Sequence, residues 1–162
     1  RHFYKPTTAF AKHFTPDNAF ILDVPDIANT TNLVVKLDKN DDGTYEKTIT
    51  LDTDFYLNPC NIQDMIGDHE APYNQLRIFA TRSNERFDPD IVKNVEITAF
   101  WGFELVPHAI KLATVLQSSR LWKRKDAPFS TYGNSDVGER ELIAKMDPDA
   151  KQLIKGYIKH RL

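Results

Sequence analysis

The apolar residues of this chain change their spacing once, near Gly102, and this change limits the folds that the chain can adopt. Before Gly102 they alternate or form short runs, as in β-strands, and after it they recur every three or four residues, as in helices. Strands are expected at 20–24 (closed by Pro25), 33–37, 44–51, 54–57, 76–80 and 95–101. The sequence therefore predicts an α+β protein, with a small antiparallel β domain at 1–105 and a helix-loop-helix region at 106–162.

The region after Gly102 is predicted to be a long helix, an irregular loop at 126–138 and a C-terminal helix. Pro107 suits the first turn of the long helix, and the cations at 123–125 suit its last turn. Asp147 and Pro148 are the residue types of an N-cap and first helical position, so the second helix is expected from 148 to about 160.

The long helix has a broad apolar stripe that needs a covering surface. The stripe holds Ala109, Leu112, Ala113, Leu116 and Arg120, and it is widened by Val115, Ser119 and Trp122. A helix buries such a stripe against another element. We expect burial against helices of the same or an adjacent subunit for Leu112, Val115, Leu116 and Trp122.

The formal net charge of −2 conceals a division between the two regions. Residues 1–105 contain 10 basic and 17 acidic residues, a net of −7, whereas residues 106–162 contain 11 basic and 6 acidic residues, a net of +5. Opposite charge on two surfaces favours contact between copies or with partners. Solvated lysines on helices explain the same numbers without any partner.

The best candidate for a ligand site is Asp38-x-Asn40-x-Asp42-Gly43, which matches the first half of a calcium loop. Position twelve of such a loop requires a bidentate glutamate, and Ile49 stands there. The flanking segments are expected to be strands, so a hairpin turn with Gly43 at positive φ accounts for the same residues.

Other patterns typical of catalysis or metal binding are incomplete. The segment 133–138 (GNSDVG) is one residue too long for a nucleophile elbow. The histidines at 2, 13, 69, 108 and 160 lack the spacing of a zinc helix. Asp64, Asp68, His69 and Glu70 crowd one loop, where solvated charges are the simpler interpretation. We therefore expect no enzyme and no cofactor.

The basic cluster of Arg120 and 122–125 could contact phosphates, but it also compensates a helix dipole, and the chain as a whole is acidic. No apolar run is long enough to span a membrane, and no secretion signal is visible. The single cysteine, Cys60, cannot form an internal disulfide.

A resemblance to the head-to-tail connector (adaptor) proteins of tailed bacteriophages begins at 95–103 (VEITAFWGF) and 106–111 (VPHAIK). It is most specific at 119–129 (SRLWKRKDAPF) and continues at 146–150 (MDPDA). Residues 1–4 (RHFY) resemble the point where the family's N-terminal helices lead into a β insertion, so those helices are expected upstream of Arg1.

The resemblance implies a structural virion protein that assembles in the host cytoplasm. Its members form a ring, dodecameric in the family, beneath the portal, where the ring extends the channel through which DNA passes. The implied partners are further copies, the portal and the next neck or tail protein. From the basic series Lys151, Lys155, Lys159 and Arg161 we expect the C-terminal helix to dock on the portal. The alternatives are another neck component, such as a stopper or tail terminator, and a soluble β-domain module for calcium or a small ligand.

Overall fold

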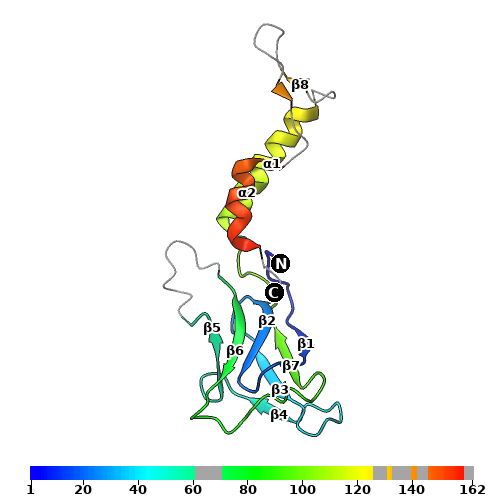
Figure 1. Cartoon of the computed structure of the whole chain (residues 1–162), viewed down its shortest axis with the longest axis vertical. Helices are drawn as coiled ribbons and strands as arrows, with labels where there is room; N and C mark the ends of the chain where they lie inside the picture. Colours follow the sequence, from blue (N-terminus) through cyan, green and yellow to red (C-terminus); the bar gives the residue numbers. More distant parts are fainter. Residues whose placement is uncertain (61–70, 126–130, 133–139, 142–145, 159–162) are drawn as a thin grey trace. The chain divides into compact units, whose positions relative to one another are not determined.

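The computed structural model describes residues 1–60, 71–125, 131–132, 140–141 and 146–158. The chain divides into two compact units, Arg1–Val106 and Pro107–Leu162 (Figure 1). In the described residues the first unit contains two antiparallel sheets and the second contains two helices. The predicted α+β class is therefore confirmed.

The sheets of the β unit have the strand orders β1-β7-β3-β4 and β2-β6-β5. Their strands are β1 (Phe10–Phe14), β2 (Ile21–Ile27), β3 (Val34–Leu37), β4 (Lys47–Ile49), β5 (Phe55–Asn58), β6 (Tyr73–Ile78) and β7 (Val95–Ala99). Strict alternation is clearest in β7, where Val95, Ile97 and Ala99 are buried and the two residues between them are only half-buried. Since side chains alternate across a strand, this pattern gives β7 one core-facing side.

One buried core is shared by both sheets. Val35 of β3 lies opposite Ile97 of β7 on one side and Ile49 of β4 on the other, and all three are buried. The same cluster includes Leu76 of β6 and Phe55 of β5 from the other sheet. The two sheets therefore pack face to face, as in a sandwich.

The β unit differs from the sequence prediction in three places. Pro25 does not close its strand: β2 continues to Ile27, with a register irregularity after Asp23. Because β2 is an edge strand, the missing N–H of Pro25 interrupts the ladder less than it would in a central strand. Strand β1 was not predicted, since none of its five side chains is fully buried. In addition, β4 is shorter than the expected 44–51.

The first five residues pack on β2 and on the segment that follows β7. Arg1 holds the buried carboxylate of Asp26 with Nε and Nη2 at 2.9 and 3.0 Å. The backbone N–H of Phe103 donates to the carbonyl of His2 at 3.2 Å, and the Phe3 and Phe103 rings lie 5.3 Å apart. These contacts fix the amino-terminal arm on the β unit.

The helical unit consists of α1 (His108–Lys125), the two-residue strands β8 (Thr131–Tyr132) and β9 (Arg140–Glu141), α2 (Pro148–Ile154) and a 3-10 turn at Lys155–Tyr157. The regular helix therefore ends before the predicted residue 160. Strand β8 lies in the segment 126–138 that was predicted to be an irregular loop, and it pairs antiparallel with β9, just after that segment. No helix in the described residues is long and apolar enough to cross a bilayer.

Candidate interaction surface

The helices α1 and α2 pack through small side chains and one polar network. Ala113 of α1 and Ala150 of α2 are both buried. The backbone N–H of Asp147 donates to Oε1 of Gln117 at 2.9 Å, and Arg120 Nη1 lies 3.2 Å from Asp147 Oδ2. Gln117 and Arg120 thus place the start of α2 along the side of α1 that carries Ala113.

Asp147 also caps α2, as its sequence predicted. Its Oδ1 accepts hydrogen bonds from the backbone N–H groups of Asp149 and Ala150 at 2.9 and 3.3 Å. The hydrogen bond from Ala150 is the largest influence on the pKa of Asp147. Partial burial raises the pKa. The hydrogen bonds from Ala150 and Asp149, together with the charge of Arg120, outweigh burial and hold the pKa of Asp147 below its ordinary value.

The opposite side of α1 carries large apolar side chains in solvent. Leu112, Val115 and Trp122 are 42%, 63% and 69% exposed. At roughly 100° per residue they fall on one stripe, roughly opposite Ala113 and Gln117. We call Leu112, Val115 and Trp122 the outer stripe. The described residues of this chain do not bury it, so its burial against an adjacent subunit stays a prediction.

The stripe predicted from the sequence is therefore divided in two. Ala113 and Arg120 face α2, the outer stripe faces away, and Leu116 is half-buried between them. Of the predicted portal-docking residues, Lys151 and Lys155 are exposed. Lys159 and Arg161 lie outside the described residues.

Cations flank the outer stripe on both sides. Lys111 and Lys123 are exposed and fall roughly 60° to either side of its centre. Lys125 Nζ lies 4.8 Å from the centre of the Trp122 ring. The sequence of α1 contains no Asp or Glu. The surface is therefore apolar at its centre and cationic at its rim.

In the β unit, three loops meet at one end and are held together by Asn94 and Lys93. Asn94 is fully buried, and its side-chain amide donates to the carbonyl of Asp38 at 2.6 Å and accepts from the N–H of Asp88 at 3.0 Å. The Lys93 N–H donates to Thr15 Oγ1 at 2.9 Å, and its carbonyl accepts from the Tyr45 hydroxyl at 2.9 Å.

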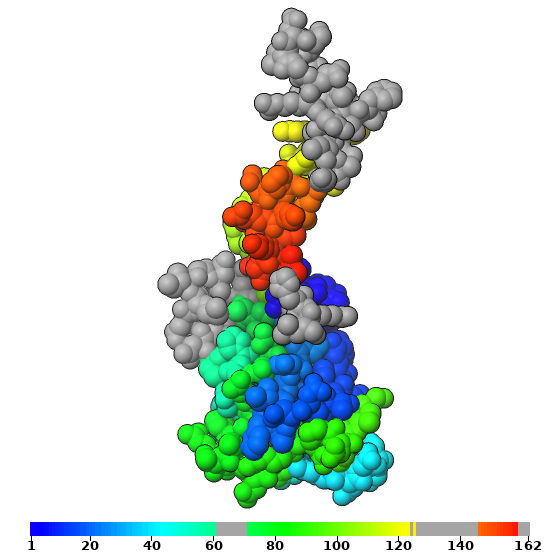
Figure 2. All heavy atoms as spheres, in the orientation of Figure 1, coloured from blue at the N-terminus to red at the C-terminus, as the bar shows by residue number. Residues whose placement is uncertain are grey.

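These loops expose several acidic side chains and one large apolar residue. Exposed carboxylates are carried by Asp17, Asp41, Asp42, Glu46 and Asp90. Val92 is 71% exposed between Ile91 and Lys93. We call Asp17, Asp41, Asp42, Glu46, Asp90 and Val92 the acidic tip, and Figure 2 shows the cyan turn and the green loop that form part of it. Of the nearby cations, Lys39 and Lys47 pair with Glu85 at 2.9 and 3.1 Å, whereas Lys93 remains exposed.

The turn proposed from the sequence as a calcium loop is a β-hairpin turn between β3 and β4. Ligand atoms of Asp38, Asp42 and Glu46 lie within 4.8 Å of one another. The sequence interpretation overlooked Glu46, although it occupies position nine of such a loop. All three carboxylates already accept hydrogen bonds within the turn. Asp38 accepts from the backbone N–H groups of Asn40 and Gly43. Asp42 accepts from the N–H of Thr44, and Glu46 accepts from the Lys39 N–H and the Asn40 side chain.

These internal hydrogen bonds also decide the charge of Asp38. Burial raises the pKa of this carboxyl, but backbone N–H groups from Gly43, Asn40 and their neighbours outweigh burial, so the pKa lies below its ordinary value. Asp38 is thus an ionised acceptor that organises the turn. A turn whose carboxylates are used in this way needs no metal to hold its shape.

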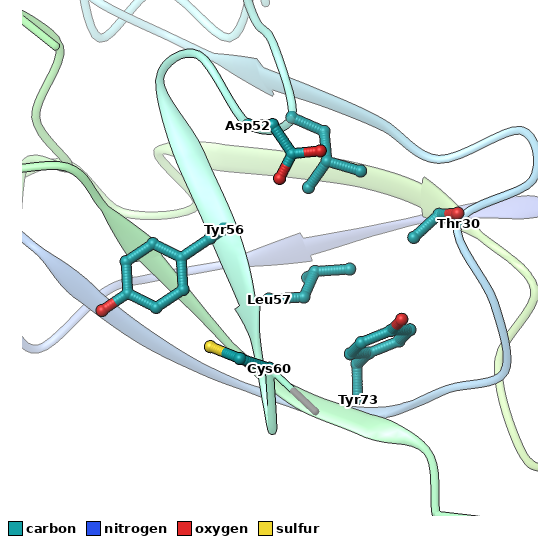
Figure 3. A pocket seen from close by; sticks show the side chains of 7 residues that line it. Thr30, Asp52, Tyr56, Leu57, Cys60 and Tyr73 are labelled. Carbon is teal, nitrogen blue, oxygen red and sulfur yellow. The ribbon is translucent and has the colours of Figure 1, made fainter. Parts of the chain in front are cut away.

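A cavity of about 310 Å³ opens beside β5 and β6 (Figure 3). Leu57, Tyr73 and Thr30 approach it together, whereas Tyr56 points to the other side of β5. Cys60 also lines the cavity, and its Sγ lies 3.0 Å from Oδ1 of Asn58, which is not a lining residue. Among the described residues, no hydrogen bond joins two of the lining side chains, so these side chains do not form a linked nucleophile and base.

The remaining sequence candidates do not form a site among the described residues. Asp64, Asp68, His69, Glu70 and the segment 133–138 lie outside the described residues, as does His160. His13 pairs with Glu96 at 3.3 Å on the sheet surface. In the basic cluster, Arg120 is engaged by Asp147. Comparisons with protein-family models, with curated proteins and with solved structures found no match to this chain.

Proposed function

We propose that this protein is a structural subunit of a bacteriophage neck, a head-to-tail connector whose copies form a ring beneath the portal. The outer stripe is the observation that carries the proposal. Leu112, Val115 and Trp122 expose large apolar side chains along one side of a well-formed helix, with the exposed Ser119 between Val115 and Trp122. Large apolar side chains gathered on one exposed face are typical of an interaction site.

The division of charge supports the same function. Because the β region carries a net of −7 and the helical region +5, copies attract through unlike surfaces. A subunit of a DNA channel also benefits from a mild overall negative charge, since each phosphate that a wall neutralises adds affinity and slows passage.

The portal is the proposed partner of α2. Lys151 and Lys155 are exposed and four residues apart, which places them on one side of the helix and the turn that follows it. With Lys159 and Arg161 they supply a basic series for an acidic portal surface. The proposed protein acts by assembly, without catalysis or cofactor, and its site of action is the virion.

Mass measurement tests the ring and the portal contact together. The 162-residue chain is measured alone and with the portal protein of the same virus, by light scattering after size exclusion. A ring bound to portal is the expected result. The double variant Val115→Gln, Trp122→Gln should remain monomeric. The matched control is Leu121→Gln, because Leu121 is 52% exposed on another side of the same helix.

The portal contact has its own variants. The double variant Lys151→Glu, Lys155→Glu should abolish portal binding while the ring still forms. Lys93→Glu, which makes the same change of charge in the β unit, should leave portal binding intact. Wild-type chain that stays monomeric and ignores portal overturns the proposed function. Binding to a different neck ring instead of the portal identifies a stopper or terminator.

A further inference from the structure

We infer that the outer stripe of one copy binds the acidic tip of a second copy. This inference rests on the proposed function, because it names the two surfaces that meet in the ring. It follows from the opposite charges of the two surfaces and from the exposed apolar side chains that each of them carries.

Pairing of two outer stripes is disfavoured by their own charge. The stripe is flanked by Lys111 and Lys123, and α1 has no acidic residue to offset them. Two copies joined symmetrically would therefore place lysine against lysine around an apolar centre. Like charges brought together at an interface oppose association.

The acidic tip has the complementary arrangement. Asp17, Asp41 and Asp90 are exposed, and their side chains make no hydrogen bond or ion pair with the described residues. Val92, at 71% exposed, supplies an apolar contact for the stripe. Asn94, buried and hydrogen-bonded to two of the loops, holds the tip in one conformation. An ordered surface loses less entropy on binding than a flexible one.

A contact between two different surfaces leaves one of each unused at the ends of a pair. Association therefore continues, and it gives a closed ring where the rotation between neighbouring copies closes, or an open filament where it does not. In a closed ring formed in this way, each subunit uses its stripe once and its tip once.

Exchange of charges tests the contact directly. The flank variant is Lys111→Glu with Lys123→Glu, and the tip variant is Asp17→Lys with Asp90→Lys. Each alone places like charges at the contact and should raise the dissociation constant for self-association by roughly tenfold or more in low salt. Mixed in equal amounts, they should associate again, since each stripe then faces a tip of opposite charge.

Further variants control for folding and for other occupants. Far-UV circular dichroism and thermal unfolding of both variants should match the wild type, because all four positions are exposed. Val92→Gln should weaken association as Val115→Gln does. If the tip variant associates like the wild type while the flank variant does not, the stripe binds something other than the tip and the inference is wrong.

The same experiments distinguish the inference from the proposed function. If the wild type forms a ring that binds portal, and the tip variant forms the same ring with the same affinity, only the stripe-to-tip contact is overturned. A wild-type chain that neither self-associates nor binds portal overturns both. Failure of the mixture to re-associate, with both variants folded, also overturns the contact.

Discussion

The backbone carbonyl oxygen of Tyr4 lies against Gly102, in the place that a Cβ would need. A Cβ added at Gly102 would come within 2.2 Å of that oxygen and within 2.9 Å of the His2 carbonyl oxygen. Gly102 also has φ of +128°, a conformation that L side chains rarely adopt. The amino-terminal arm can therefore cross this point only because the residue is glycine.

We expect Gly102→Ala to lower the free energy of unfolding by about 3 kcal/mol or more, because the backbone conformation and the close approach each penalise a side chain. Urea denaturation of the β unit within the full chain measures the change. The matched control is Gly43→Ala, where φ is +81° but no atom lies within 4 Å of the added Cβ. It should cost about 1 kcal/mol, the conformational part alone. Equal losses in the two variants would show that the arm moves away at no cost.

Asn94 is predicted to stabilise the acidic tip. Asn94→Ala removes two buried hydrogen bonds, to the Asp38 carbonyl and from the Asp88 N–H, and should cost about 2–4 kcal/mol in unfolding free energy. Asn40→Ala, which removes an exposed bond to Glu46, should stay within about 0.5 kcal/mol of the wild type. Chemical denaturation compares the two, and a small effect at Asn94 would mean that water replaces its amide.

Calcium is predicted to leave the 38–46 turn unaffected. The carboxylates of Asp38, Asp42 and Glu46 already accept hydrogen bonds inside the turn, and the sequence position for a bidentate glutamate is occupied by Ile49. Titration calorimetry with calcium should therefore give no binding heat. Asp38→Ala should lower the unfolding midpoint equally with and without calcium, because it removes acceptors for Asn40 and Gly43. Measurable binding that Asp38→Ala abolishes would restore the calcium-module alternative.

Local patterns predicted the parts of the fold that are decided locally. The alternation at Val95, Ile97 and Ala99 gave β7, and Asp147-Pro148 gave the start of α2. Strand β1 escaped detection because its side chains are at most half-buried. Its position depends on pairing with β7, more than eighty residues away in the chain, and on the hydrogen bond from Trp101 Nε1 to the Phe10 carbonyl at 2.8 Å.

The candidate surface was predictable only in part. Helical spacing indicated the residues of the outer stripe but not the side that α2 takes, since Leu112 and Ala113 are neighbours in one broad apolar pattern. The choice depends on Gln117 and Arg120 meeting Asp147, a contact across about thirty residues. The acidic tip has no local signature at all, because Asn94 joins loops that are remote in sequence.

Acid should loosen the helical unit through Asp147. The pKa of Asp147 is lowered in the folded chain, so its ionised form contributes stability that is complete above the ordinary pKa of 3.8 and is lost as pH falls through the folded value. Asp147→Asn still caps α2 but cannot ionise or pair with Arg120. The wild type should therefore be the more stable protein by a constant margin above about pH 5, and this margin should shrink below about pH 4. Thermal unfolding at a series of pH values from about pH 6 down to about pH 3, followed by the helical far-UV signal, measures the margin. Glu85, whose pKa is lowered chiefly by its hydrogen bond with Lys39, is common to both proteins and cancels in the comparison. A margin that persists unchanged to pH 3 would show that the carboxylate charge contributes nothing and that the cap acts through hydrogen bonding alone.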